Sequence, residues 1–258
     1  MLRKLCGKKP HTVKLLVAFR HGKDYLLLFP WAECDLLAYW QRDSGLREER
    51  RRKESYPLIA WAARQCHGLL GALHWIHDPS STVLDPKNQP LYGRHGDVKP
   101  ENILWYKQNG DGPHPLASGE LVLSDFGLTS LHHNETGSNV KNGGVQFTTT
   151  YAPPESVLPD KEISRSIDIW ALGCVFLEFV TWIVGGPSHV DEFRAARTSP
   201  FLKSFCNDNF WEVQEFEVPT TGIQKHGTVV VVKPAVEEVC ALWAVLYDAH
   251  SLFCWSKH

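Results

Sequence analysis

The sequence predicts an α+β fold in which short strands near the N-terminus precede a mostly helical remainder. Two short apolar runs, 13–19 and 25–29, flank a polar turn, which is typical of a β-hairpin. Between 58 and 76 the apolar residues recur at spacings of three and four, which predicts a long amphipathic helix: Leu58, Ile59, Ala62, Cys66, Leu69, Leu73 and Ile76. Nearly every position in 167–180 is apolar, so we expect a central helix there with no solvated face.

Other segments extend this outline. Residues 102–106 and 121–124 are compact apolar runs, and the Gly- and Pro-rich stretch between them predicts a long hairpin loop. The segment 128–151 is polar and offers few residues to a core. Four consecutive valines predict an extended segment at 227–233, and 236–247 is a further helix candidate.

Composition narrows the function classes. The 258 residues suit one or two domains, and a net charge of −2 gives no basic excess for nucleic acid or an anionic membrane. The seven cysteines are odd in number and never form C-x-x-C, which favours reduced core thiols over disulfides or a zinc site. The longest apolar stretch, 170–184, is shorter than a membrane span needs, and no continuous apolar core of a secretory signal occurs. We therefore expect an intracellular protein, cytoplasmic or nuclear.

The most informative segment is His-Gly-Asp-Val-Lys-Pro-Glu-Asn at 95–102. Asp-Phe-Gly follows at 125–127, Pro-Pro-Glu at 153–155, and Asp168 opens the apolar helix. Each motif alone is weak, but the four in this order are specific. This order resembles that of the eukaryotic protein kinase family, in which the catalytic loop, DFG motif, APE motif and central helix follow one another. Within that family, the chain resembles a Ser/Thr-type catalytic domain that is N-terminally truncated.

The resemblance covers essentially the whole chain and implies a protein kinase-like fold. It implies one incomplete kinase domain over 1–258, with a β-rich N-lobe remnant at 1–29, a hinge at 30–35 and a mostly helical C-lobe at 36–258. No G-x-G-x-x-G precedes the hinge, and no V-A-I-K-like lysine or partner glutamate is found. We therefore expect the cover over the nucleotide phosphates to be missing and nucleotide binding by this chain to be weak.

Phosphoryl transfer requires groups that position the nucleotide and neutralise charge. By the resemblance, Asp97 orients the substrate hydroxyl and accepts its proton, and Lys99 neutralises the transferring phosphoryl group. Asn102 and Asp125 supply hard oxygen ligands suited to Mg²⁺. In the alternative interpretation, Asp125 bonds backbone amides at a strand end.

The same resemblance implies a nucleotide-binding surface. Leu28 takes the gatekeeper position, the backbone from Phe29 to Trp31 meets the adenine, Asp35 reaches the ribose, and Leu104 lies under the adenine ring. From the residues alone, Leu28 and Leu104 could equally be ordinary core residues.

Six further residues are implied to support the site structurally: His95, Phe126, Gly127, Thr148, Glu155 and Asp168. Asp168 holds the backbone of the catalytic loop, and Thr148 joins Asp97 to Lys99, as in the Ser/Thr-directed branch. His95 is expected to be a packed, hydrogen-bonded core residue. A metal site at His74 and His77, three apart on the long helix, lacks a third ligand nearby, so packing is the simpler hypothesis.

Two departures from the family pattern concern these supports. Glu155 resembles a glutamate that pairs with an arginine late in the helical lobe, yet no arginine follows Arg197. Gly96 stands where most members carry an arginine that clamps an activation-loop phosphate. We therefore expect weak dependence on phosphorylation of that loop.

The leading hypothesis is a Ser/Thr protein kinase that uses ATP and Mg²⁺ to phosphorylate a protein substrate. The alternative is a pseudokinase or truncated kinase fragment that acts as a binding scaffold without turnover. The intact reactive residues favour the enzyme, and the missing phosphate cover favours the scaffold. P-loop NTPases and G-x-S-x-G hydrolases are disfavoured because neither motif occurs. The oligomeric state and the identity of the substrate leave no signal in the sequence.

Overall fold

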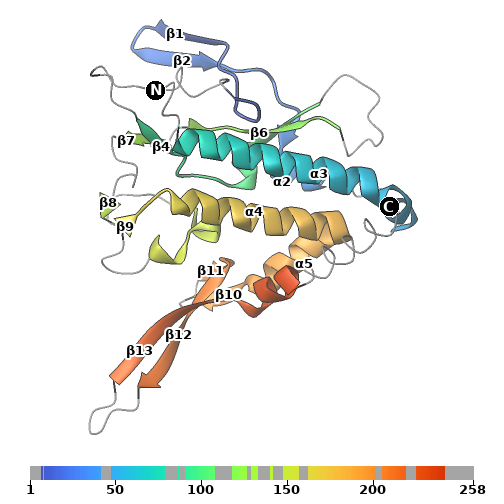
Figure 1. Ribbon diagram of the computed structural model, residues 1–258, viewed down its shortest axis with the longest axis vertical. Helices are drawn as coiled ribbons and strands as arrows, with labels where there is room; N and C mark the ends of the chain where they lie inside the picture. The colour runs from blue at the N-terminus through green and yellow to red at the C-terminus, as the bar shows by residue number, and fades with distance from the viewer. Residues whose placement is uncertain are drawn as a thin grey trace, which may run out of the picture.

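The computed structural model describes residues 7, 9–41, 48–78, 87, 91–107, 118–126, 129–132, 140–141, 148–156, 162–201, 205–218 and 225–241. Its elements are two long helices with several small sheets of two or three strands around them (Figure 1). This mixed arrangement of helices and small sheets agrees with the expected α+β class.

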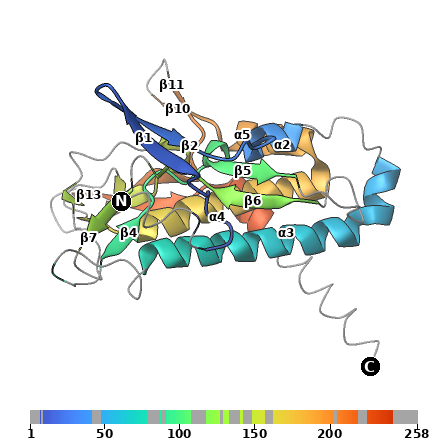
Figure 2. The same ribbon diagram turned by 90° about the horizontal axis from the view of Figure 1, so that it is seen from above.

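The two long helices form the centre of the molecule. Helix α3 (Glu48–His77) and helix α4 (Ser166–Gly185) lie side by side, as Figures 1 and 2 both show. Leu73 and Ile76 of α3 are fully buried, as are Val175 and Phe179 of α4, so the core lies between the two helices. Burying each such side chain contributes roughly 1.5–3 kcal/mol relative to leaving it exposed.

Helix α3 differs from the prediction at its N-terminal end. It begins at Glu48 rather than at Leu58 and contains Pro57. The charged residues that precede the apolar periodicity are therefore helical, which a search for apolar faces could not detect. Ile59 is 43% exposed, so its assignment to the buried face was wrong, whereas Trp61 and Ala62 are buried.

Helix α4 was expected to be too short to span a membrane and to have no solvated face. By length and composition its 20 residues could span one, but 56% of its most apolar window lies inside the fold. That burial is typical of the core helix of a globular protein. Ile169, within the predicted range 167–180, is about half exposed, so burial on every side was the wrong expectation. Gly186 ends the helix with a φ of 77°, a left-handed conformation that favours glycine.

The predicted N-terminal hairpin is present as an isolated pair of strands. Strand β1 (Val17–His21) pairs antiparallel with β2 (Asp24–Leu28), and Gly22 forms the turn with a φ of 62°. All of β2 is exposed, and the hairpin projects from one end of the molecule in Figure 1. It belongs to no larger sheet among the described residues.

A three-stranded sheet connects the hinge region to the two predicted central strands. Its order is β3 (Cys34–Asp35), β5 (Ile103–Tyr106) and β6 (Glu120–Leu123), so the predicted pairing of 102–106 with 121–124 is confirmed. Short helix α2 (Leu36–Gln41) follows β3 and buries Tyr39 and Trp40 against α4, where Trp182 Nε1 donates to the carbonyl oxygen of Trp40 at 2.8 Å.

Two further antiparallel pairs flank the ends of the helices. Strand β4 (Tyr92–Arg94) pairs with β7 (Ser130–His132), and β8 (Val140–Lys141) pairs with β9 (Glu162–Ile163). The β4 and β7 pair brings the two sides of the predicted site together, because β4 leads into the catalytic loop and β7 follows the Asp-Phe-Gly motif.

The C-terminal part has more strand than predicted. After helix α5 (Pro187–Arg197) come the antiparallel pair β10 (Ser199–Phe201) and β11 (Phe205–Asn207). The longer pair β12 (Trp211–Val218) and β13 (Lys225–Val232) follows, and it projects at the lower end in Figure 1. The extended segment at 227–233 is confirmed in β13. Residues 234–241 are helical, and the rest of that predicted helix lies outside the described residues.

Candidate active site

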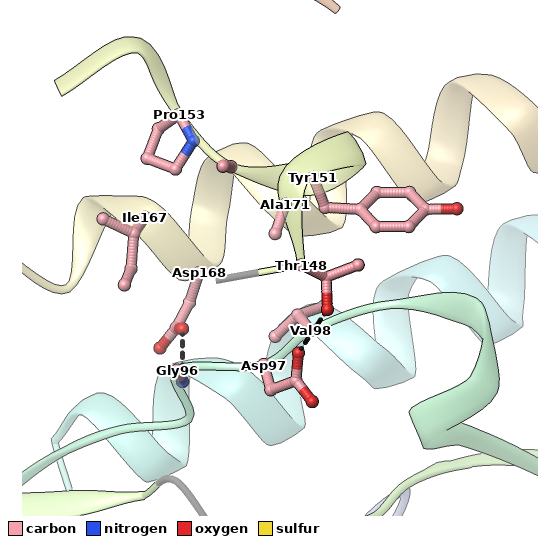
Figure 3. Close-up of a pocket in the computed structure, with 10 residues that line it drawn as sticks. Gly96, Asp97, Val98, Thr148, Tyr151, Pro153, Ile167, Asp168 and Ala171 are labelled. Atoms are coloured by element: carbon pink, nitrogen blue, oxygen red, sulfur yellow. Dashed lines mark hydrogen bonds between the residues drawn. The ribbon is translucent and has the colours of Figure 1, made fainter. Parts of the chain in front are cut away.

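Asp97 lies at the centre of a compact polar network between β4 and β5. Thr148 Oγ1 donates to its Oδ1 at 3.0 Å (Figure 3). Lys99 Nζ lies 2.9 Å from Asp97 Oδ2. Asn102 Nδ2 donates both to the backbone oxygen of Asp97 at 2.8 Å and to Oδ2 at 2.9 Å. Lys99 Nζ also donates to Thr148 Oγ1 at 3.2 Å. The structure thus brings together four residues that the sequence singled out.

The network sets the charge of Asp97. Partial burial acts to raise the pKa of its carboxyl group, but the hydrogen bonds from Lys99, Thr148 and Asn102 and the charge of Lys99 outweigh burial and leave the pKa below its usual value. Asp97 is therefore ionised at neutral pH and can orient a hydroxyl group. Its side chain is mostly covered, which strengthens these contacts relative to a fully solvated pair.

Asp168 holds the backbone on which Asp97 sits. Its carboxylate accepts the backbone N–H groups of His95 and Gly96 and the Nε2–H of His77, each at 2.8 Å. The side chain is fully enclosed, and these three donors compensate its charge. Gly96 has a φ of 85°, so this position favours a residue without Cβ.

His77 therefore packs against Asp168 rather than standing free as a metal ligand. Its Nε2 is occupied by that contact, and His74 is exposed on the same helix. Within the described ranges, no group of three His, Cys, Asp or Glu side chains could hold a metal ion. The structure thus favours the packing hypothesis for this pair.

His95 is fully buried and connects the catalytic loop to the Asp-Phe-Gly segment. Its Nε2 donates to the backbone oxygen of Ser124 at 2.9 Å, and its Nδ1 accepts the Asp97 N–H at 3.3 Å. Burial lowers the pKa of this imidazole, so the ring is neutral and these two contacts select the Nε2–H tautomer. The Phe126 ring lies 5.3 Å from it, centroid to centroid, whereas Gly127 lies outside the described residues.

Ser124, the residue before Asp125, is hydrogen-bonded to Asn102. The N–H and Oγ–H of Ser124 both donate to the backbone oxygen of Asn102, each at 2.9 Å. Asp125 has a φ of 58°, a left-handed conformation that costs an ordinary residue roughly 1–2 kcal/mol and Asp somewhat less. Asp125 is also exposed to solvent, and backbone strain of this kind is common at functional sites.

The donor set at this point fits a magnesium ion. Asn102 uses its amide nitrogen on Asp97 twice, which leaves the amide oxygen as the group able to accept a cation. Asp125 offers carboxylate oxygens. Mg²⁺ prefers such hard oxygen ligands and is commonly bound by one or two protein groups together with substrate phosphates.

The residues expected to meet the nucleotide are only partly brought together. Asp35 lies directly opposite Leu104 in the β3 and β5 pair, and its Oδ1 also accepts the Ala38 N–H at the start of α2, at 2.8 Å. Leu28 is 53% exposed at the end of β2, so the alternative that it is a core residue is wrong. Phe29 packs against the core, whereas Trp31 is 93% exposed.

Arg197, the last arginine in the sequence, pairs with Glu178 of α4. Arg197 Nη2 donates to Glu178 Oε1 at 2.8 Å, and Tyr151 OH donates to Glu178 Oε2 at 2.8 Å. Glu155 accepts a hydrogen bond from Ser166 Oγ at 3.3 Å. Sequence reasoning missed Glu178, although a glutamate inside an apolar helix is a signal for a buried partner.

A small pocket, partly open to solvent, lies beside Asp97 (Figure 3). The catalytic loop forms one wall and the first turns of α4 another. The third wall is the segment 148–153, which includes the short 3₁₀ helix η4 (Thr149–Tyr151). The catalytic loop, α4 and the segment 148–153 thus line a pocket next to Asp97.

Comparisons with known proteins show which proteins this chain is similar to. A family model described as protein kinase domain matches residues 1–188. The probable cyclin-dependent kinase 8 of Dictyostelium discoideum is 32% identical over 173 residues, which make up 66% of this chain and 39% of that protein. The cyclin-dependent kinase D-1 of Arabidopsis thaliana is 30% identical over 224 residues, 83% of this chain and 47% of that protein. The chain thus spans less than half the length of these relatives.

Proposed function

Because this chain belongs to the protein kinase family, we propose that it transfers the γ-phosphate of ATP to a Ser or Thr hydroxyl of a protein substrate. The observation that carries the proposal is the closed network of Asp97, Lys99, Thr148 and Asn102. Such an arrangement suits a reaction in which the protein mainly positions groups and neutralises charge.

Each member of the network has a role that its contacts support. Asp97 accepts hydrogen bonds at both carboxylate oxygens and is held ionised, so it can orient an incoming hydroxyl and take its proton. Lys99 places a compact positive charge next to that carboxylate, suited to the transferring phosphoryl group. Thr148 bridges the two side chains and fixes their separation.

Asn102 and Asp125 would hold Mg²⁺, which supplies charge neutralisation at the nucleotide phosphates when bound. Asp35 and Leu104 would lie against the ribose and the adenine, since they face each other across β3 and β5. Leu28, Phe29 and Trp31 would lie along the outer side of the nucleotide. We expect an intracellular location, in the cytoplasm or the nucleus.

The boundaries of the domain also remain a proposal. The family match ends at residue 188, so the extension of the C-lobe to residue 258 stays a prediction, as does the division at 29 and 35. The alternative of a scaffold without turnover is not favoured, because a binding module would not need the complete Asp97 network.

The test is phosphate transfer from labelled Mg-ATP to a serine peptide by the full chain. We expect the unmodified chain to transfer phosphate to the peptide. Asp97→Asn should abolish transfer, and Asp191→Asn, an exposed position on α5, should leave it unchanged. Equal transfer by Asp97→Asn and the unmodified chain would overturn the proposal.

A binding experiment addresses the cation ligands separately. Mg-ATP should raise the melting temperature of the unmodified chain slightly, and Asp125→Ala should remove this rise. Asp191→Ala is the matched control, because it deletes a carboxylate far from the network in sequence. An undiminished rise in Asp125→Ala would exclude that residue as a cation ligand.

A further inference from the structure

We propose that the corner at residues 208–211 is a positioning device that holds Thr148 against Asp97 and Lys99; this inference rests on the proposed function. The corner connects β11 to β12 and lies beyond residue 188, where the family match ends. Its residues do not touch the reactive groups themselves. They act through the segment 148–153.

Two hydrogen bonds join the corner to that segment. Thr150 Oγ1 donates to Asp208 Oδ1 at 2.6 Å, and Trp211 Nε1 donates to the backbone oxygen of Ala152 at 2.8 Å. The Tyr151 ring, between these two contacts, lies 6.2 Å from the Phe210 ring. Three successive residues of the segment are thus held by one short stretch of the C-terminal part.

The corner is itself fixed by a buried cation. The Arg197 guanidinium lies between the rings of Phe193 and Phe210, at 4.2 and 4.0 Å from their centroids. Its Nε donates to the backbone oxygen of Asp208 at 3.1 Å, while its Nη2 holds Glu178. The corner is therefore anchored to α4 through a charged group with no access to solvent.

A second buried cation, Lys233 directly after β13, also holds the corner. Lys233 Nζ donates to the backbone oxygens of Arg197 at 2.6 Å and Asn207 at 3.1 Å. Its backbone N–H donates to the Phe210 oxygen at 3.2 Å. Burial lowers the pKa of Lys233, whereas the backbone acceptors around Nζ stabilise its ammonium form.

The held segment places Thr148. The Tyr151 N–H donates to the Thr148 oxygen at 3.2 Å, so η4 forms one hydrogen-bonded turn with Thr148 at its start. Fixing Thr150, Tyr151 and Ala152 fixes the direction in which Thr148 enters the network. A single turn with two exposed or half-exposed residues has little stability of its own.

The first test compares hydrogen exchange in two variants of the full chain. Trp211→Phe removes the indole N–H and keeps an aromatic ring. Trp61→Phe is the matched control, because Trp61 Nε1 also donates to a backbone oxygen, that of Gly119 at 2.9 Å. We expect the Tyr151 and Ala152 amides to exchange about tenfold faster in Trp211→Phe, corresponding to one lost hydrogen bond, and not in Trp61→Phe. Equal exchange in both variants would overturn the inference.

A second pair of variants covers the case in which Trp211→Phe fails to fold. Asp208→Ala removes the acceptor of Thr150, whereas Asp208→Asn keeps a carbonyl oxygen at the same place. We expect faster exchange in Asp208→Ala and near-normal exchange in Asp208→Asn. Rescue by asparagine supports positioning, and indistinguishable variants would contradict it.

Transfer kinetics connect the contact to the reaction. Thr148 bridges Asp97 and Lys99, so loosening it in Trp211→Phe should disturb the alignment of these two side chains and slow transfer. The kcat should fall while the KM for ATP stays constant. Faster exchange with an unchanged kcat would exclude a role in the reaction. If the unmodified chain transfers no phosphate, the proposed function fails, and the exchange result still decides the positioning.

Discussion

Arg197 and Glu178 form an ion pair at 2.8 Å in which both side chains are completely buried. The pair joins α5 to the middle of α4, and Tyr151 donates its hydroxyl hydrogen to the same glutamate. Burial strongly raises the pKa of Tyr151, with the charge of Glu178 adding to the effect, so the phenol remains a donor at any ordinary pH. One carboxylate thus links the C-terminal part to the segment beside the site.

Neutralising this carboxylate should destabilise the whole fold. Glu178→Gln leaves the buried Arg197 charge uncompensated, and removing one partner of a buried pair costs about 3–5 kcal/mol. We expect a loss of that order in the free energy of unfolding measured in urea. The double variant Arg197→Met, Glu178→Leu should recover part of the loss, because neither charge of this pair is then left buried without its partner. A Glu178→Gln chain as stable as the unmodified one would contradict this account.

Loss of the Asp168 carboxylate should also destabilise the fold, for a different reason. Its carboxylate accepts N–H groups from His77, His95 and Gly96, and Asp168→Ala leaves all three without an acceptor. A buried donor without a partner costs about 1–3 kcal/mol, so the free energy of unfolding should fall by roughly 3 kcal/mol or more. Asp191→Ala, on the surface of α5, should change it by less than about 0.5 kcal/mol. A small effect at Asp168 would show that the catalytic loop is held by other groups.

The buried imidazole of His95 should make the fold less stable in mild acid. Burial lowers the pKa of its imidazole below the ordinary value of 6.5, so the unfolded chain gains a proton at higher pH than the folded chain. Stability is complete above pH 6.5 and falls as the pH drops below it, by up to about 1.4 kcal/mol per pH unit. Urea midpoints between pH 7.5 and roughly 5 should follow this slope. His95→Gln should flatten it, whereas substitution of the exposed His67 should not.

Much of the site could be predicted from the sequence because its members are held by local geometry. Asp97, Lys99 and Asn102 lie within one loop and the 3₁₀ turn η1 (Pro100–Asn102), and pairing of β5 with β6 brings Asp125 next to Asn102. Thr148 is the exception, since it reaches Asp97 from a different segment. Its place came from the family resemblance, not from spacing.

The missed features depend on contacts that no periodicity encodes. The pairing of β12 with β13 joins a strand of mixed acidic and apolar residues to a run of valines, and alternation in the first strand is irregular. Arg197 looks like the end of a solvated helix in sequence. In the structure it is enclosed by Phe193 and Phe210, which only the tertiary fold brings to it. The polar beginning of α3 was missed because charged helical turns carry no apolar signal.

Thr148 offers the most direct test of how the network sets the charge of Asp97. Thr148→Ala removes a hydroxyl donor to an ionised carboxylate, a contact worth about 1.5–3 kcal/mol, and leaves Lys99 with one acceptor fewer. The Asp97 pKa should rise, so phosphate transfer should require higher pH before it reaches its plateau, and kcat should fall roughly tenfold or more. Thr148→Ser keeps the hydroxyl and should restore both the acid limb and most of the rate. An acid limb that is the same in Thr148→Ala, Thr148→Ser and the unmodified chain would mean that this hydroxyl does not control the ionisation of Asp97.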